Sequence, residues 1–172
     1  KLEAGNIKIK SAELGADWQD YGGGFNHIVG LGGQGNDSII LSGFDESNIT
    51  FNLQGGVGDD TIKFIEDASK APATGAGAVI KGGRGNDTLI GGHLNDIIYG
   101  GQGNDHIEGG RGYDILFGDQ GELQLLNGGG SQSIGTRVSG LDGNDEIYGG
   151  SKTNEMLADA DLDDIIFGGG GL

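Results

Sequence analysis

The sequence lacks several features on which protein stability and function commonly depend. It has no cysteine and one proline, and aromatic residues make up 6% of its 172 residues. Disulfides therefore cannot hold the fold, and hydrophobic residues, at 34%, are too few for a thick globular core. No apolar stretch approaches the roughly 18 residues that a membrane-spanning helix needs.

Positive charge is also scarce, and its scarcity excludes further classes of partner. The chain has 10 Lys and Arg against 26 Asp and Glu, which gives a formal net charge of -16 at pH 7. Nucleic acids and anionic membrane surfaces bind through patches of Lys and Arg, so neither is an expected partner. The surplus of carboxylates indicates instead that cations offset the conformational entropy of this polar chain.

Glycine is abundant, with 40 residues, and it follows a short repeat. From Gly82 to Phe117 a nine-residue unit occurs four times without a break: GGRGNDTLI, GGHLNDIIY, GGQGNDHIE and GGRGYDILF. A fixed short period of this kind is typical of a solenoid. Glycine at the first, second and fourth positions permits φ > 0 in a tight turn, and the triplet after the aspartate favours a strand.

Other copies of the motif GGxGxD lie outside this run. Complete copies occupy 32–37, 55–60, 82–87, 100–105 and 109–114. Partial copies that keep the aspartate occupy 91–96, 140–145 and 159–164. Two further copies, at 118–123 and 149–154, end in Leu123 and Asn154, and because both have lost the carboxylate we expect weak metal binding there.

The ligand chemistry of these turns favours calcium. Stacked strands lie about 4.8 Å apart, where two carboxylates repel by roughly 3 kcal/mol at an effective dielectric near 20. Calcium takes about six to eight oxygen ligands at about 2.3–2.6 Å, so it can bridge such a pair, with main-chain carbonyls completing its shell. The absence of cysteine and the scarcity of histidine argue against zinc, and magnesium fits poorly because it requires rigid octahedral geometry.

The predicted ligands are the turn carboxylates and the carbonyls of the turn glycines. The carboxylates are those of Asp37, Asp60, Asp87, Asp96, Asp105, Asp114, Asp145 and Asp164. The glycines are Gly33, Gly35, Gly56, Gly58, Gly83, Gly85, Gly92, Gly101, Gly103, Gly110, Gly112 and Gly143. We predict no catalytic residue, because no HExxH, no GxSxG and no helpfully spaced Ser/His/Asp set is present, and the three histidines are expected at the surface.

Period-two alternation along each strand buries the middle residue of each triplet. The predicted core therefore consists of Ile39, Ile62, Leu89, Ile98, Ile107, Leu116, Ile147 and Ile166, with Met156 in a weaker position.

The pattern GGxGxDxUx, where U is a large aliphatic residue, resembles the calcium-binding nonapeptide of RTX (repeats-in-toxin) proteins. The likeness is close over 82–117, interrupted over 32–63 and 118–172, and absent before about residue 28. It implies an all-β fold, a parallel β-roll or β-solenoid with calcium ions in the glycine-rich turns, in which two nonapeptides make one turn. Asp87 would then lie over Asp105, and Asp96 over Asp114.

We expect a single β-solenoid domain over residues 1–172. Its expected parts are an N-terminal cap (1–31), irregular longer turns (32–81), regular nonapeptide repeats (82–117), an insertion (118–139) and degenerate repeats (140–172). Strands within the irregular part are expected near 39–41, 49–53, 61–65 and 78–80.

The expected function is that of a calcium-binding structural module in a secreted or cell-surface bacterial protein of the exoprotein, adhesin or surface-layer type. The RTX resemblance implies type I secretion and folding outside the cell, where calcium is plentiful. Two alternatives stay open: the C-terminal roll of a secreted lipase, protease or epimerase, and a subunit of a calcium-dependent extracellular filament or lattice. Self-association end to end would suit the latter, because Gly168–Leu172 resembles the opening of another turn.

Overall fold

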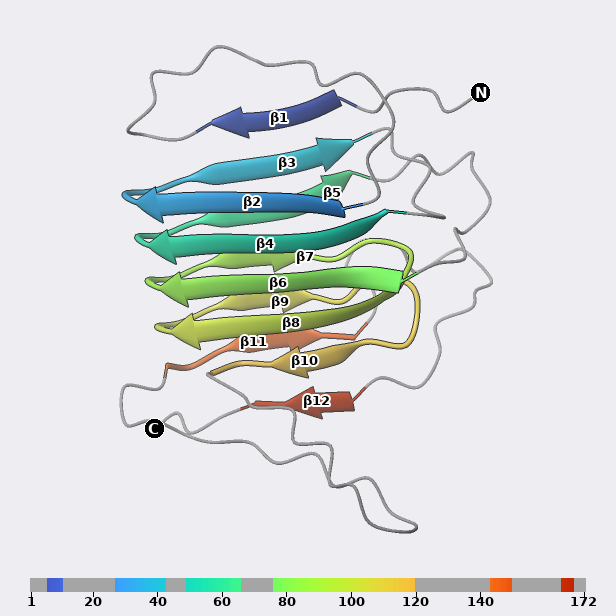
Figure 1. Cartoon of the computed structure of the whole chain (residues 1–172). Coiled ribbons are helices and arrows are strands. Elements are labelled where there is room, and N and C mark those ends of the chain that lie inside the picture. Colours follow the sequence, from blue (N-terminus) through green and yellow to red (C-terminus); the bar gives the residue numbers. More distant parts are fainter. Residues whose placement is uncertain are drawn as a thin grey trace, which may run out of the picture.

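The structure is a computed structural model that describes residues 6–10, 27–42, 49–65, 76–119, 143–149 and 165–168. In these residues the chain forms twelve strands in two six-stranded sheets. Figure 1 shows the two sheets face to face, with strands stacked from the N-terminal to the C-terminal end of the chain. Among the described residues no helix has the length and apolarity needed to span a membrane.

Sheet A contains the odd-numbered strands in the order β1-β3-β5-β7-β9-β11. Their bounds are β1 Asn6–Lys10, β3 Ser38–Ser42, β5 Thr61–Ile65, β7 Thr88–Ile90, β9 His106–Glu108 and β11 Glu146–Tyr148. Sheet B contains the even-numbered strands in the order β12-β10-β8-β6-β4-β2. Their bounds are β2 His27–Gln34, β4 Thr50–Val57, β6 Ala76–Arg84, β8 Asn95–Gln102, β10 Ile115–Phe117 and β12 Ile165–Phe167.

The register within each sheet follows the repeat. In sheet A, Leu89 of β7 lies beside Ile107 of β9, and the two strands are parallel. In sheet B, Ile98 of β8 lies beside Leu116 of β10, also in a parallel pair. Each pair is separated by two nonapeptides, so two nonapeptides make one turn of the roll, which we call a rung. The prediction of a parallel β-roll is confirmed.

The N-terminal end of sheet A is built differently from the rest. Strand β1 pairs with β3 in antiparallel orientation and occupies the terminal position of the sheet. Sheet B instead begins with β2, which pairs with β4 in parallel orientation and starts at His27, inside the range expected for the cap. The strands expected in the irregular part are present as β3, β4, β5 and β6.

The core is a file of apolar side chains between the sheets. It contains six of the predicted residues, namely Ile39, Ile62, Leu89, Ile98, Ile107 and Leu116. It also contains six that were not predicted, namely Leu41, Phe51, Leu53, Phe64, Ala78 and Ile80. These six lie in the longer strands β3 to β6, where alternation places two apolar side chains of each strand in the core instead of one.

The prediction that Ile166 is buried is wrong, since this residue is 47% exposed. Among the described strands, its strand β12 is the last of sheet B and has only β10 as a neighbour, so the inward face is covered from one side. Ile147 in β11, the last strand of sheet A, is partly buried and packs against the core for the same reason. Met156 lies outside the described residues.

Candidate metal sites in the stacked turns

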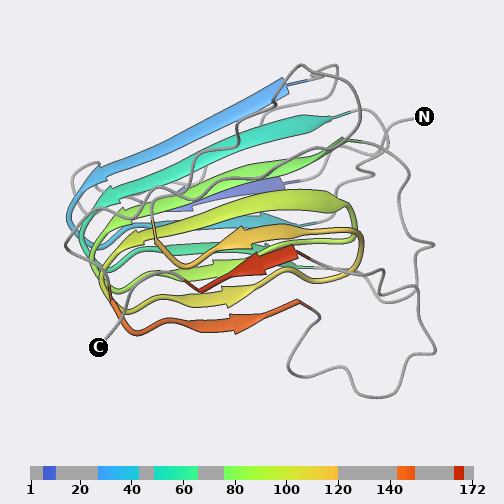
Figure 2. The same cartoon turned by 90° about the horizontal axis from the view of Figure 1, so that it is seen from below.

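The turns of the roll form two edges. At the first edge the chain passes from a strand of sheet B to a strand of sheet A, as from β2 to β3, and at the second edge it returns. Figure 2, which views the roll from below, shows the first-edge turns stacked one over another. The predicted ligands Asp37, Asp60, Asp87, Asp105 and Asp145 lie on the first edge, and Asp96 and Asp114 lie on the second edge.

Glycine is required in these turns for two separate physical reasons. Gly83 and Gly85 have φ of 128°, a left-handed conformation that other residues rarely adopt. At Gly82 the restriction is spatial, because a Cβ atom would collide with Oδ2 of Asp87 and the carbonyl oxygen of Gly100. The first glycine of the nonapeptide thus leaves room for the carboxylate of its own turn.

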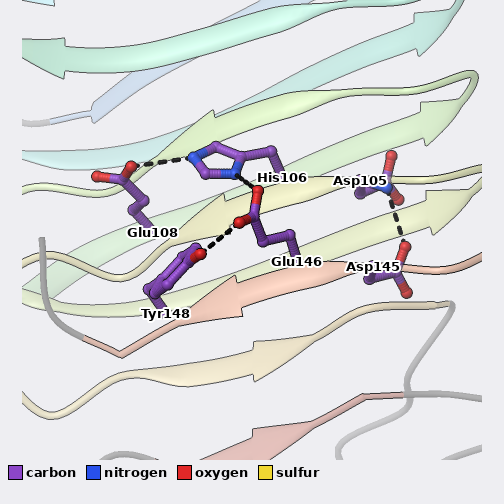
Figure 3. Close-up of polar contacts among 6 residues, drawn as sticks. All are labelled: Asp105, His106, Glu108, Asp145, Glu146 and Tyr148. Carbon is purple, nitrogen blue, oxygen red and sulfur yellow. Dashed lines mark hydrogen bonds and ion pairs between the residues drawn. The ribbon is translucent and has the colours of Figure 1, made fainter. Parts of the chain in front are cut away.

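Hydrogen bonds link the first-edge aspartates into a ladder. In each pair the backbone N–H of one aspartate donates to Oδ1 of the aspartate one rung further along. The pairs are Asp37 to Asp60 at 2.8 Å, Asp60 to Asp87 at 2.8 Å, Asp87 to Asp105 at 2.8 Å and Asp105 to Asp145 at 2.9 Å. The last of these is drawn in Figure 3. The ladder fixes one oxygen of each accepting carboxylate and stacks the acids as predicted.

The second oxygen of three of these carboxylates has no comparable partner. Oδ2 of Asp60, Asp87 and Asp105 is buried and accepts no hydrogen bond, although the three residues are only 1–2% exposed. A buried carboxylate oxygen without a donor is costly, and proteins normally pair such an atom or place it on a metal ion. These oxygens therefore mark positions where a cation fits.

Burial of the acids changes their titration. The pKa of Asp105 is raised to about 7, chiefly by burial; the hydrogen bond from the Asp87 N–H lowers it, and the charges of Asp87, Asp145 and Asp119 add to the rise. Burial likewise raises the pKa of Asp87 to about 6, and it raises the pKa of Asp60. The metal-free fold thus disfavours the charged carboxylates that a divalent cation would stabilise.

The second edge repeats this arrangement over only part of its length. The N–H of Asp96 donates to Oδ1 of Asp114 at 2.8 Å, and the N–H of Ala78 donates to Oδ1 of Asp96 at 2.7 Å. Ala78 thus stands where an aspartate would stand, and Phe51 of β4 lies beside it. Phe51 packs edge-on against Phe64, with ring centroids 5.0 Å apart. Apolar packing therefore replaces the carboxylates at the N-terminal rungs of the second edge.

The turn between β10 and β11 is interrupted by residues 120–142. A Cβ on Gly118 would collide with Oδ2 of Asp145, as one on Gly100 would collide with Oδ2 of Asp105. Gly118 and Asp145 therefore belong to one turn, and the interpretation of 118–123 as a copy that has lost its acid is wrong. This pairing could not be recognised in the sequence, because residues 120–142 interrupt the nine-residue period between Gly118 and Asp145. Leu123, Asn154 and Asp164 lie outside the described residues.

The predicted glycine ligands lie in the same turns. Ten of them have a left-handed φ, between 96° and 131°: Gly33, Gly35, Gly56, Gly58, Gly83, Gly85, Gly101, Gly103, Gly110 and Gly112. The carbonyl oxygens of Gly56 and Gly58 point toward Gly83 and Gly85 of the next rung. Gly92 donates its N–H to Oδ2 of Asp96 at 2.9 Å, and Gly143 packs against Gly103.

A second ladder of hydrogen bonds was not predicted from the sequence. Its residues are the polar residues that directly precede the turn aspartates, and this recurring position could have indicated it. In this ladder the side-chain oxygen of each residue accepts a hydrogen bond from the backbone N–H of the equivalent residue in the next rung. The direction is opposite to that of the aspartate ladder, in which the earlier residue is the donor. The pairs are Asn36 with Asp59, Asp59 with Asn86, Asn86 with Asn104 and Asn104 with Asn144, at 2.7–3.0 Å. This exposed ladder aligns the turns without using the buried carboxylates.

His106 lies away from the turns, on the face of sheet A (Figure 3). Its Nε2 is 2.9 Å from Glu108 and its Nδ1 is 3.0 Å from Glu146. The hydroxyl of Tyr148 donates to the same Glu146 carboxylate. The contact with Glu146 connects β9 to β11 in the next rung, so His106 has a structural role in holding these two strands together.

Side chains alone do not make a ready metal cluster in the described residues: no group of three or more His, Asp or Glu is suitably placed. Two carboxylates from adjacent rungs, together with glycine carbonyls, supply an all-oxygen set of the kind calcium prefers. A calcium ion bound there would neutralise a buried pair of acids and use the oxygens that accept no hydrogen bond.

The architecture defines the class of the protein, a parallel β-roll with carboxylates stacked in its glycine turns. Residues 74–105, 94–122 and 136–160 match the family described as RTX calcium-binding nonapeptide repeat (4 copies). This part of the chain thus carries RTX calcium-binding repeats, as the sequence resemblance indicated. No curated protein and no solved structure matches the chain. The copies at 32–37 and 55–60 lie outside the match yet have the same turn geometry.

Proposed function

We propose that this chain is a calcium-binding structural module of a secreted or cell-surface bacterial protein, and that it folds when it meets calcium outside the cell. The observation that supports the proposal most directly is the row of buried Oδ2 atoms on Asp60, Asp87 and Asp105. In the cytosol, where calcium is scarce, these acids oppose folding. Outside the cell, calcium would reverse their effect.

The energy available from calcium is large enough for this role. A ligand that binds only the folded state adds about 2.7 kcal/mol per site at a hundredfold excess over its Kd. The net stability of a domain is about 5–15 kcal/mol, so a few occupied turns would decide whether the chain folds. Type I secretion, which exports unfolded chains, suits a protein with this dependence. In this proposal no residue of the chain is catalytic.

Circular dichroism during a calcium titration tests the proposal, starting from chelated protein and with magnesium in a parallel titration. We expect a cooperative change from coil to β structure with calcium and none with magnesium at the same concentration. Full β structure in chelator would contradict calcium-driven folding. A C-terminal roll of a secreted enzyme would respond in the same way, and its catalytic groups would lie outside this chain.

Assembly end to end is the second candidate function, and the terminal strand β2 favours it. Val29 and Leu31 on this strand are 56% and 67% exposed, which is high for large aliphatic residues. In the described residues β2 pairs on one side only, with β4. Light scattering against protein concentration, with and without calcium, tests this candidate. Particles that grow only in calcium would support it, and a constant monomer mass would exclude it.

A further inference from the structure

The turn between β10 and β11 carries a buried acid where the other first-edge turns have glycine. Asp119 follows Gly118 as Gly101 follows Gly100, and it is 4% exposed. Gly101 has a φ of 123°, whereas no non-glycine residue in the described part of the chain has a positive φ. The backbone at Asp119 therefore departs from the standard turn, and a carboxylate is buried as a result.

The oxygen that lacks a partner on Asp105 points toward this part of the turn. Asp105 is 2% exposed, and its Oδ2 accepts no hydrogen bond. A Cβ on Gly100 would collide with both this Oδ2 and the carbonyl oxygen of Gly118. Oδ2 of Asp105 and the carbonyl oxygen of Gly118 therefore lie close together beside Gly100. Gly118 is the residue directly before Asp119 in the chain.

Hydrogen bonds bring the far side of the insertion to the same place. The N–H of Gly143 donates to Oδ1 of Asp119 at 3.4 Å, and the N–H of Asp105 donates to Oδ1 of Asp145 at 2.9 Å. Asp119 and Asp145, from the two sides of residues 120–142, thus concentrate negative charge at one partly buried turn.

We propose that the interrupted turn is a calcium site in which the Asp119 carboxylate supplies an oxygen in addition to those of Asp105 and Gly118. An ion bound there also holds together the two ends of the 120–142 insertion, and so secures β11 on the roll. The inference rests on the proposed calcium-binding function of the chain. Because ligand charge count tunes calcium affinity, this turn would bind more tightly than first-edge turns with glycine at the same position.

Two substitutions test the role of Asp119 in the whole chain. Asp119→Gly introduces glycine, the residue that the standard first-edge turn has at this position, as at Gly101. Asp119→Asn removes the charge but keeps a side-chain oxygen that can accept the hydrogen bond from the Gly143 N–H. The matched control is Asp59→Asn, which also removes one carboxylate. It introduces asparagine, the residue that the next turn has at the equivalent position, Asn86. Asp59 lies on the exposed ladder, not at the interrupted turn.

Hydrogen exchange measured by mass spectrometry during a calcium titration provides a local readout. We expect both Asp119 variants to raise the calcium midpoint for protection of residues 143–149 by about tenfold or more, as loss of a metal-site partner commonly does. Protection of residues 61–65 should keep its midpoint in these variants. Isothermal titration calorimetry should show one tight site fewer than in the unsubstituted protein.

The possible results separate this inference from the function on which it rests. If the unsubstituted protein binds no calcium, the proposed function fails. If it binds calcium but Asp119→Asn shifts the 143–149 midpoint no further than Asp59→Asn does, the Asp119 site is overturned. An equal shift in both regions would also overturn it, because a local ligand cannot weaken distant turns by the same factor.

Discussion

The backbone N–H of Asp87 donates a 2.8 Å hydrogen bond to Oδ1 of Asp105, which lies 18 residues further along the chain and one rung further along the roll. This bond turns the Asp105 carboxylate into the turn and leaves its Oδ2 buried without a donor. The same relation recurs between Asp60 and Asp87. Each turn therefore stabilises the next by a hydrogen bond while accumulating buried charge that a cation would relieve.

Removal of one turn charge should have opposite effects with and without calcium. In Asp87→Asn the side-chain oxygen can still accept the Asp60 N–H, but the buried negative charge is lost. Since burial raises the pKa of Asp87 to about 6, the calcium-free variant should gain stability on the order of 1–3 kcal/mol at pH 7.5. In saturating calcium the variant should instead be less stable than the parent.

Folding in chelator, driven by a stabilising osmolyte and followed by circular dichroism, and urea unfolding in calcium together measure both effects. Asp59→Asn is the control, because it removes an exposed charge from the neighbouring turn. Destabilisation of Asp87→Asn by the same amount in both conditions would show that the carboxylate serves packing and not metal binding.

The calcium-free protein should become more stable on acidification. Asp105 and Asp87 have folded-state pKa values of about 7 and about 6, above the 3.8 of the ordinary group. Protonation is therefore favoured in the folded state, and the cost of charged acids is complete above about pH 7 and absent below about pH 4. Decalcified protein folded by a stabilising osmolyte at pH 7.5, 6 and 5 should therefore need less osmolyte as the pH falls.

With calcium present the pH trend should reverse, because protons compete with the ion for the same oxygens. The two series together form the test, measured in the same buffers. If the decalcified protein instead needed more osmolyte to fold as the pH falls, the buried-acid account of the turns would be contradicted.

The sequence predicts the regular part of the fold because there the chemistry is local. Glycines, an aspartate and a strand triplet lie within nine residues, so the turn and the strand follow from the spacing. The stacking of Asp87 over Asp105 follows from the RTX resemblance, which implies two nonapeptides in each turn of the roll. What was missed depends on long-range relations. The pairing of Gly118 with Asp145 spans an insertion, and the exposure of Ile166 follows from its position in a terminal strand.

The second edge shows the same limit of local reasoning. Nothing near Phe51 in the sequence indicates that it lies beside Ala78. In the next rung Asp96 occupies the position equivalent to Ala78 and belongs to the carboxylate ladder. The register that brings these residues together crosses loops of unequal length. The replacement of acids by apolar residues along this edge could therefore be found only from the structure.

The first glycine of the repeat should be intolerant of even a methyl group. In Gly82→Ala the new Cβ would collide with Oδ2 of Asp87 and with the carbonyl oxygen of Gly100. We expect a loss of more than about 2 kcal/mol in calcium, since both oxygens are fixed by the turn. Gly168→Ala is the matched control, because a Cβ there meets no atom of the described residues, and it should change stability by less than about 0.5 kcal/mol. Similar losses in both variants would refute the steric argument.

Apolar packing at the N-terminal rungs should contribute stability that does not depend on calcium. Phe51 is 2% exposed and packs against Phe64, at an edge position where the later rungs have Asp96 and Asp114. Phe51→Ala should cost about 3–5 kcal/mol, as expected for a buried phenylalanine, and it should leave calcium affinity at the aspartate turns unchanged. Hydrogen exchange of residues 50–57 and 87–108, in chelator and in calcium, separates the two regions. If the substitution instead raised the calcium midpoint for 87–108 tenfold, the second edge would act as one cooperative unit along its whole length, and the apolar rungs would be part of the calcium response.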